Sequence, residues 1–111
     1  MISMICHSTD HTFNNDLRSE GLTLVNFWAT WCSPCRMLAP VLEDFDATRR
    51  DDVKIVKINV DENAETASFY GVMSLPTTIL FKDGKPVNKQ IGYMSQEALA
   101  GWVSANVNST R

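Results

Sequence analysis

The chain has 111 residues, of which 44% are hydrophobic and 21% are charged, and its formal net charge is −3. This length suits one domain with a single core, so residues 1–111 are expected to fold as one unit. The mildly acidic balance excludes the basic surface typical of nucleic-acid or anionic-membrane binding, and no apolar run approaches the ~18 residues of a membrane span.

The first part of the chain predicts a short strand, a helix and a long buried strand. Residues 3–8 could form an edge strand. A helix is expected over residues 13–19, with Thr12 as its N-cap and Gly21 ending it. Residues 22–29 are nearly all apolar or β-branched, which is typical of a central strand buried on both faces.

A second helix is predicted to begin around residues 32–34, because Pro34 in the first turn costs no hydrogen bond. Its core face has apolar side chains at helical spacing, namely Leu38, Val41, Leu42 and Phe45. Pro40 predicts a kink, since an internal proline removes a backbone donor and crowds the preceding turn. Residues 53–60 then indicate a second buried strand.

The remaining pattern predicts a short helix, a hairpin and a last helix. Asn63 can cap a helix through residue 70, and strands are expected at residues 77–81 and 86–91, joined by a turn whose glycine favours positive φ. Ser95 opens the last helix. Its inward stripe is Leu99, Trp102 and Val103. This order predicts an α/β fold in which helices cover both faces of a mixed sheet.

Two cysteines separated by two residues stand where the central strand gives way to a helix. The functional interpretation of Cys32 and Cys35 is dithiol/disulfide exchange. Two alternatives are half of a zinc site and a structural staple. A closed zinc site needs about four ligands, and only Cys6, His7 and His11 could supply the others. A staple across so short a loop removes little unfolded-state entropy. We therefore expect a redox pair and no metal site.

The segment FWATWCSPCR at residues 27–36, the later Leu75-Pro76-Thr77 and Gly92 resemble the thioredoxin family, and the likeness spans the whole chain. In that family a central mixed five-stranded sheet, flanked by four helices, carries the redox pair at the start of a helix, and a cis proline faces it. The resemblance implies that Pro76 is that cis proline.

Three positions depart from the family pattern. The family usually has glycine at Ser33, lysine at Arg36 and a buried aspartate at Asn26. Ser33 is still small and Arg36 is still positive, so these two changes are mild. Asn26 is a larger change, because an amide cannot accept or release a proton as a carboxylate does.

Catalysis by exchange needs a cysteine that ionises readily and is accessible. Cys32 is expected to attack, because the helix N-terminus offers its anion free N–H groups and a positive dipole end. Cys35, one turn later and expected to be buried, then resolves the mixed disulfide, while Arg36 adds a weaker bias. We expect Asn26 to remove the family's carboxylate proton route; alternatively, it is a hydrogen-bonded structural residue.

Target proteins are expected to bind a flat apolar rim, which the resemblance places at Trp31, Pro34, Leu75, Pro76 and Gly92. The backbone of residue 75 would pair with an extended target segment, and the missing side chain at residue 92 leaves room for it.

Four further side chains have lesser expected roles. Trp28 is expected to support the active-site turn from the core, and Lys57 to extend its amine towards water. Tyr93 either extends the rim or is an ordinary half-exposed aromatic. Cys6 is expected to be a small buried hydrophobe.

The resemblance implies a protein-disulfide reductase without a bound organic cofactor, recharged by a flavin-containing, NADPH-dependent thioredoxin reductase. Two alternatives are open: a pair kept oxidised to donate or isomerise disulfides, and a non-catalytic interaction module. The odd cysteine count and the lack of a secretory leader favour a reducing, cytoplasmic location. A monomer is expected.

Overall fold

The computed structural model describes residues 3–109. Strands and helices alternate along most of the chain, and the last two strands form a hairpin. The elements are β1 (Cys6–His7), α1 (Phe13–Asp16), β2 (Leu22–Trp28), α2 (Ser33–Arg49), β3 (Val53–Asn59), α3 (Ala64–Phe69), β4 (Thr77–Lys82), β5 (Lys85–Ile91) and α4 (Gln96–Ser109).

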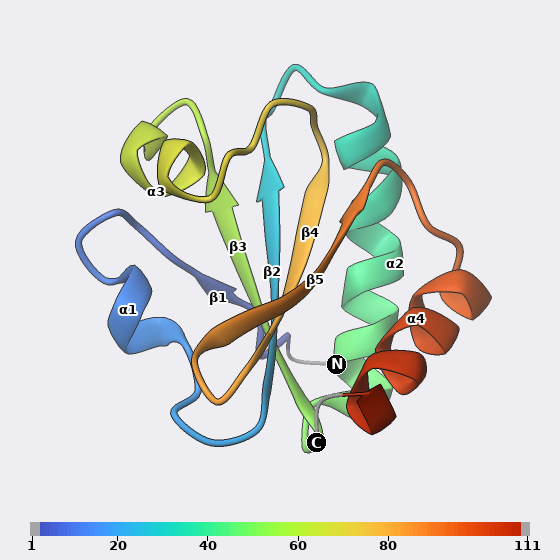
Figure 1. The fold of residues 1–111 in the computed structure, drawn as a ribbon. Helices are drawn as coiled ribbons and strands as arrows, with labels where there is room; N and C mark the ends of the chain where they lie inside the picture. Colours follow the sequence, from blue (N-terminus) through green and yellow to red (C-terminus); the bar gives the residue numbers. More distant parts are fainter. Residues whose placement is uncertain (1–2, 110–111) are drawn as a thin grey trace.

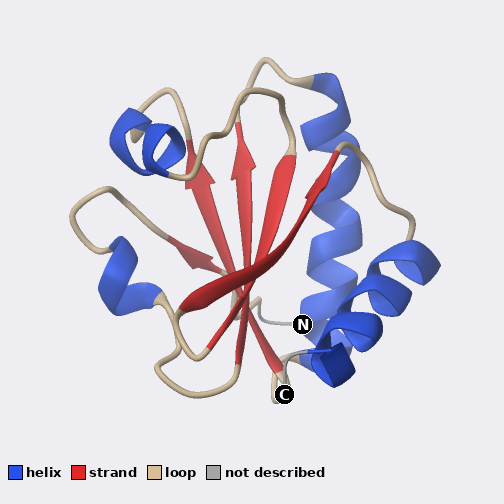
Figure 2. Ribbon diagram, in the orientation of Figure 1, coloured by secondary structure: helices blue, strands red, loops and turns tan. Residues whose placement is uncertain are grey.

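The strands form one five-stranded sheet in the order β1-β3-β2-β4-β5. Both β1 and β2 run parallel to β3, whereas β4 is antiparallel to β2 and to β5. Helices α1 and α3 lie on one side of the sheet, and α2 and α4 lie on the other (Figures 1 and 2). The predicted mixed sheet with four flanking helices is confirmed.

Each face of the sheet has its own hydrophobic cluster, because the side chains of the central strands alternate between the two faces. The cluster under α2 and α4 includes Leu24, Leu38, Leu42, Ile55, Leu80, Leu99 and Val103. The cluster under α1 and α3 includes Phe13, Val25, Phe27, Val56, Ile58, Ile79 and Phe81. The predicted core face of α2 is therefore confirmed, and so is the burial of both central strands.

The first helix is shorter than predicted. It ends at Asp16, and Leu17 is extended with φ −73° and ψ 141°. Leu17 packs against the cluster under α1 and α3, and the next amide, of Arg18, donates to the Thr23 hydroxyl at 2.9 Å. Tertiary contacts therefore end the helix three residues early. Thr12 occupies the N-cap position without a capping bond.

The residue at the N-cap of α3 was predicted correctly, but the capping bond from its side chain was not. Asn63 occupies the N-cap position but makes no capping hydrogen bond. Its amide oxygen instead accepts from the amide of Asp10 at 2.9 Å. The Asp10 carboxylate caps the helix, accepting from the amides of Glu65 and Thr66 at 3.3 and 2.8 Å. A residue more than fifty positions earlier therefore supplies the cap.

Other local predictions hold with changed bounds. The strand expected at residues 3–8 is only two residues long, although it does lie at the sheet edge. Helix α2 continues across Pro40. In the hairpin turn both Asp83 and Gly84 have positive φ, 52° and 83°, and the Ser95 hydroxyl accepts from the Ala98 amide at the start of α4.

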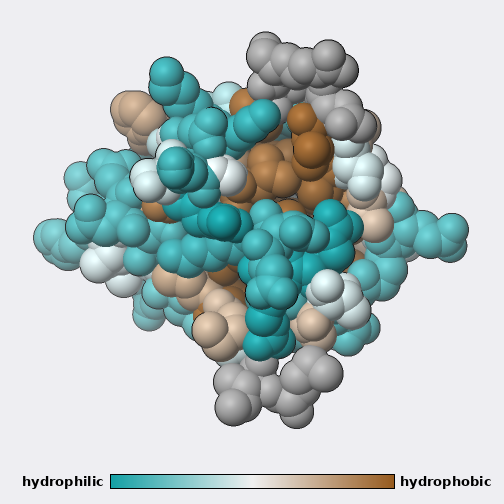
Figure 3. Space-filling view, turned by 90° about the horizontal axis from the view of Figure 1, so that it is seen from below, coloured by the Kyte–Doolittle hydropathy of each residue, from teal (hydrophilic) through white to brown (hydrophobic). Residues whose placement is uncertain are grey.

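The end of the molecule opposite Cys32 has a mainly hydrophilic surface with smaller hydrophobic areas (Figure 3). None of the helices within residues 3–109 combines the length and apolar character that crossing a bilayer requires.

Candidate active site

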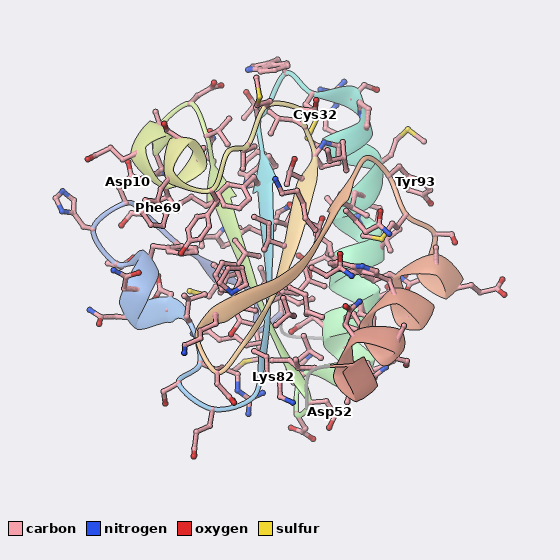
Figure 4. The ribbon with its side chains drawn as sticks, in the orientation of Figure 1. Asp10, Cys32, Asp52, Phe69, Lys82 and Tyr93 are labelled. Atoms are coloured by element: carbon pink, nitrogen blue, oxygen red, sulfur yellow. A yellow bond between two sulfur atoms is a disulfide. The ribbon has the colours of Figure 1, made fainter. Side chains whose placement is uncertain are left out.

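Cys32 lies where β2 gives way to α2, at the upper end of the sheet (Figure 4), and Cys35 follows in the first turn of α2. They form a disulfide, with their Cα atoms 5.3 Å apart. Cys32 is the N-cap of α2, and its sulfur accepts from the amide of Cys35 at 3.3 Å. Its carbonyl accepts from the Arg36 amide at 3.2 Å, which begins the helix. The sequence thus places one sulfur at the positive end of a long helix.

Exposure does not distinguish the two cysteines in this disulfide form, because each is 5% exposed. The expectation that only Cys35 is buried is therefore wrong for the oxidised pair. The pair packs with Ala29, and against Trp28 and Leu75. In the disulfide form both cysteines therefore lie among apolar neighbours. The predicted support of the pair by Trp28 is confirmed by this packing.

Two polar contacts brace the active-site turn. The indole of Trp31 is 66% exposed, and its Nε1 donates to the Asp61 carboxylate at 2.9 Å. The Arg36 guanidinium donates to the carbonyl of Thr30 at 2.8 Å. Arg36 therefore contributes more than its positive charge, because its side chain also links α2 to the active-site turn. Ser33, in the first turn of α2, is exposed.

The peptide bond between Leu75 and Pro76 is cis, as the resemblance implied. Pro76 is buried, and its carbonyl accepts from the Gly92 amide at 2.8 Å. Gly92 has φ +97°, which requires glycine, and an added Cβ would meet no atom within 4 Å. The space beside Gly92 is thus open to another molecule. Pro34, in α2, is exposed.

An apolar groove of about 270 Å³ adjoins Trp31 and Leu75. Its remaining lining residues are Val60, Ala67, Val72 and Met73. Met73 is 94% exposed. These four residues were not predicted from the sequence. Two sequence signals could have indicated three of them. Val72 and Met73 closely precede the Leu75-Pro76 pair. Val60 directly follows β3, which is parallel to β2, so it lies at the same end of the sheet as the cysteine pair.

A row of polar side chains crosses the α2 face of the sheet. Asn26 is 2% exposed, and the strand register places it between Lys57 on β3 and Thr78 on β4. The Asn26 Nδ2 and the Thr78 hydroxyl are both buried without a hydrogen-bond partner. The alternative role of Asn26 as a hydrogen-bonded structural residue is therefore not supported for its amide nitrogen, which has no partner. Thr78 was not identified from the sequence.

The Lys57 amine lies against an aromatic ring, a contact that was not predicted from the sequence. Its Nζ lies 5.0 Å from the centre of the Trp28 ring, where the negative face of the indole attracts a cation. Burial lowers the pKa of Lys57, and the charge of Glu43 opposes that shift.

Cys6 is only partly buried, and it packs against the cluster under α1 and α3. Burial, followed by the nearby charge of Asp16, raises the pKa of its thiol. A thiol that resists ionisation is a poor nucleophile.

Known proteins resemble this chain over nearly its whole length. The family model described as Thioredoxin matches residues 4–105. A thioredoxin of Bacillus subtilis (strain 168) is 50% identical over 103 residues, which cover 93% of this chain and 98% of that protein. A thioredoxin of Alicyclobacillus acidocaldarius subsp. acidocaldarius is 53% identical over 91 residues, or 82% of this chain and 87% of its own. A thioredoxin of Listeria monocytogenes serovar 1/2a is 53% identical over 96 residues, covering 86% and 92%.

Proposed function

The chain belongs to the thioredoxin family and is a protein-disulfide oxidoreductase with a redox-active cysteine pair, and we propose that Cys32 is its nucleophile and Cys35 its resolving residue. One observation carries this assignment: the Cys32 sulfur is the cap of α2 and accepts from the amide at residue 35. The same amide is available to a thiolate in the reduced protein. A helix N-terminus favours such an anion.

The exchange takes place in two steps. The Cys32 thiolate attacks one sulfur of the target disulfide, forming a mixed disulfide and releasing the other target sulfur as a thiolate. Cys35 then loses its proton and attacks the Cys32 sulfur, which closes the pair and releases the second target sulfur. The target gains two electrons, and the cysteine pair loses two.

The assignment is tested with single serine variants and an unrelated disulfide protein as substrate. Cys32→Ser should lose all reductase activity, because no nucleophile remains in the first step. Cys35→Ser should accumulate a covalent adduct with the substrate, seen by mass spectrometry and reversed by a reducing agent. The assignment would be overturned if the adduct in Cys35→Ser were carried by Cys6, even if Cys32→Ser had lost its activity.

Target proteins, we propose, dock on the apolar rim formed by Trp31, Pro34, Leu75, Pro76 and Gly92. Three observations support the proposal: the exposed indole of Trp31, the apolar groove beside it, and the open space at Gly92. Among the described residues, neither the amide nor the carbonyl of Leu75 makes a backbone hydrogen bond. An extended target segment can therefore pair with it as an added strand.

Asn26 bears on the second step. Without a carboxylate there, the proton of Cys35 leaves through solvent or with the departing sulfur. Resolution should then depend less on pH near neutrality than it does in a variant that has the carboxylate. The test is the rate of mixed-disulfide resolution across pH for the wild type and Asn26→Asp. Superimposable profiles would defeat the hypothesis.

The family implies disulfide-containing target proteins and a reductase as kinds of partner. We propose more specifically that a flavin-containing, NADPH-dependent thioredoxin reductase recharges the pair, and that no cofactor binds this chain itself. A reductant of this kind suits a reducing compartment, which supports a cytoplasmic location. We also propose that the chain functions as a monomer of one domain. Reduction by purified reductase and NADPH tests the first proposal, and sedimentation tests the last.

A further inference from the structure

An exposed aromatic ring lies at the edge of a cavity on the α3 side of the molecule. Phe69, the last residue of α3, is 80% exposed. It lines a cavity of about 190 Å³ together with the rings of Phe13 and Tyr70. Asp10 and Glu65 line the same cavity, and Figure 4 shows Asp10 close to Phe69 beside this helix. Three rings and two carboxylates therefore share one small space that the proposed exchange mechanism does not use.

The three rings are not stacked on one another. The centre of the Tyr70 ring lies 5.6 Å from that of Phe13 at an interplanar angle of 56°, and 4.9 Å from that of Phe69 at 81°. Rings at such angles enclose a corner instead of forming a flat layer. The electron-rich face of an aromatic ring attracts a cation, and sets of rings that surround a cavity bind ammonium groups. The arrangement therefore favours a positively charged ligand over a neutral one.

The charges around the cavity favour the same kind of ligand. Among the described residues that line it, two carry a carboxyl group and none is a lysine or an arginine. The hydrogen bond from the Thr66 hydroxyl lowers the pKa of Asp10, so this group is a carboxylate at neutral pH. His11 interacts with Asp10 by charge, but it does not line the cavity. An entering cation therefore meets carboxyl groups and displaces no basic side chain from the cavity wall.

The hydrogen bonds of Asp10 distinguish between the two strongly basic side chains. Its Oδ1 accepts from the amide and the hydroxyl of Thr66 at 2.8 and 2.6 Å, and its Oδ2 accepts from the Glu65 amide at 3.3 Å. Both oxygens are thus engaged with α3. Arginine binds a carboxylate best through a bidentate contact with both oxygens. A lysine ammonium is a compact charge that needs no such geometry, so lysine suits this cavity better.

The cavity and the groove beside Trp31 are both formed partly by α3. Ala67 of α3 and Val72, just after the helix, line the groove, whereas Glu65 and Phe69 line the cavity. A protein bound in the groove is therefore in contact with the helix that forms one wall of the cavity. A basic side chain of that protein can then reach the cavity across α3.

We propose that the cavity formed by Asp10, Phe13, Glu65, Phe69 and Tyr70 binds a lysine side chain of a protein that is docked on the rim. This inference rests on the proposed function, because the docked protein is a substrate of the cysteine pair. The ammonium lies against the rings and near the carboxylates, and the alkyl chain packs on Phe69. The cavity then selects among disulfide-containing proteins and takes no part in the exchange itself.

The site is tested on the disulfide form by titration with Nα-acetyl-lysine methylamide, followed through the backbone amide resonances. Saturable shifts are expected at the residues that line the cavity. The norleucine derivative, which has an alkyl chain without the charge, should bind at least about threefold more weakly. Phe69→Ala should weaken binding of the lysine derivative about three- to tenfold, and Glu65→Gln about two- to fivefold. The matched control is Glu97→Gln, an exposed glutamate in the first turn of α4, which should bind as the wild type does.

The role in docking is tested with two synthetic disulfide peptides as substrates. They differ only in a lysine or a norleucine at the end of a flexible linker, and a series of linker lengths is compared. At the best length the lysine peptide should have a KM about threefold lower than the norleucine peptide, with the same kcat. This advantage should disappear in Phe69→Ala and persist in Glu97→Gln.

The titration contains no thiol chemistry, so its failure would leave the assignment of the cysteines intact. Shifts that do not saturate, or that lie outside the cavity, would overturn the inference. Equal KM values for the two peptides at every linker length would overturn it as well. So would tighter binding of choline than of the lysine derivative, because the cavity would then be a site for a small quaternary ammonium compound. If neither peptide is reduced at all, the proposed function itself is overturned.

Discussion

The two faces of the sheet are built differently. Under α1 and α3 aromatic rings pack on the apolar cluster: Phe81 lies 5.9 Å from Phe13 and 5.3 Å from Tyr70, centroid to centroid. Under α2 the apolar cluster stops at Leu24, and the row through Asn26 and Thr78 follows. The face that carries the redox pair therefore includes buried polar atoms without a partner, whereas the buried Thr23 on the other face is hydrogen-bonded.

This difference shows that burial alone does not identify the important polar residues. Thr23 and Thr78 are both fully buried on central strands, 0% exposed. The first has its hydrogen bond, while the second has none. Violations of local rules in natural proteins are expected at functional sites. The unpartnered threonine lies on the face of the sheet that α2 covers.

The largest predicted effect lies on the face under α1 and α3. Phe81→Ala should reduce the free energy of unfolding by about 3–5 kcal/mol, because a fully buried ring is lost and a cavity remains. The rates of thiol exchange in the folded fraction should not change. Urea unfolding combined with a disulfide-reduction assay measures both quantities.

The matched control is Phe69→Ala, since that ring packs at the edge of the same aromatic group but is 80% exposed. It should change stability by no more than about 0.5 kcal/mol. Equal losses in the two variants would show that burial of the Phe81 ring is not what stabilises the protein here.

A middle-sized effect is expected at Asp10, which lies beside α3 (Figure 4). Asp10→Ala should cost about 1–2 kcal/mol at neutral pH, because the helix loses its cap. The hydrogen bond from the Thr66 hydroxyl holds the pKa of Asp10 below its ordinary value of 3.8. The carboxylate's contribution is thus fully present above that value and is lost as pH falls through the lower, folded value.

The stability difference between the wild type and Asp10→Ala should consequently be constant from neutral pH down to the ordinary value and shrink below it. Urea unfolding at a series of pH values measures the difference. A difference that grows on acidification would contradict the capping role.

The smallest effect separates the two buried threonines. Thr23→Val should lose about 1 kcal/mol, since the Arg18 amide is left without its acceptor. Thr78→Val should be neutral or slightly stabilising, because it removes a hydroxyl that has no partner within the protein. Thermal unfolding of the two variants side by side provides the comparison. A larger loss for Thr78→Val would mean that its hydroxyl is well satisfied.

Patterns within single elements predicted the fold well. Apolar runs identified β2 and β3, helical spacing identified the core face of α2, and the glycine turn identified the hairpin. The end of α1 was missed because a tertiary bond to Thr23 fixes it. The cap of α3 was missed because Asp10 lies far away in sequence. Local propensity contains no information on such contacts.

The cysteine motif of the candidate site was predicted well, whereas the contacts around it were predicted less well. The motif placed the cysteine pair, and the family resemblance placed the cis bond at Pro76. The brace from Asp61 to Trp31 and the position of Thr78 beside Asn26 depend on strand register. Register is set by pairing between distant segments, so these contacts required the structure.

The central claim is that Cys32 is the readily ionised thiol of the pair. Alkylation of Cys32 in the reduced Cys35→Ser variant, followed by mass spectrometry across a pH series, tests it most directly. We expect an alkylation midpoint clearly below pH 8.5, which is about the ordinary pKa of a cysteine thiol. A midpoint at or above that value would contradict it.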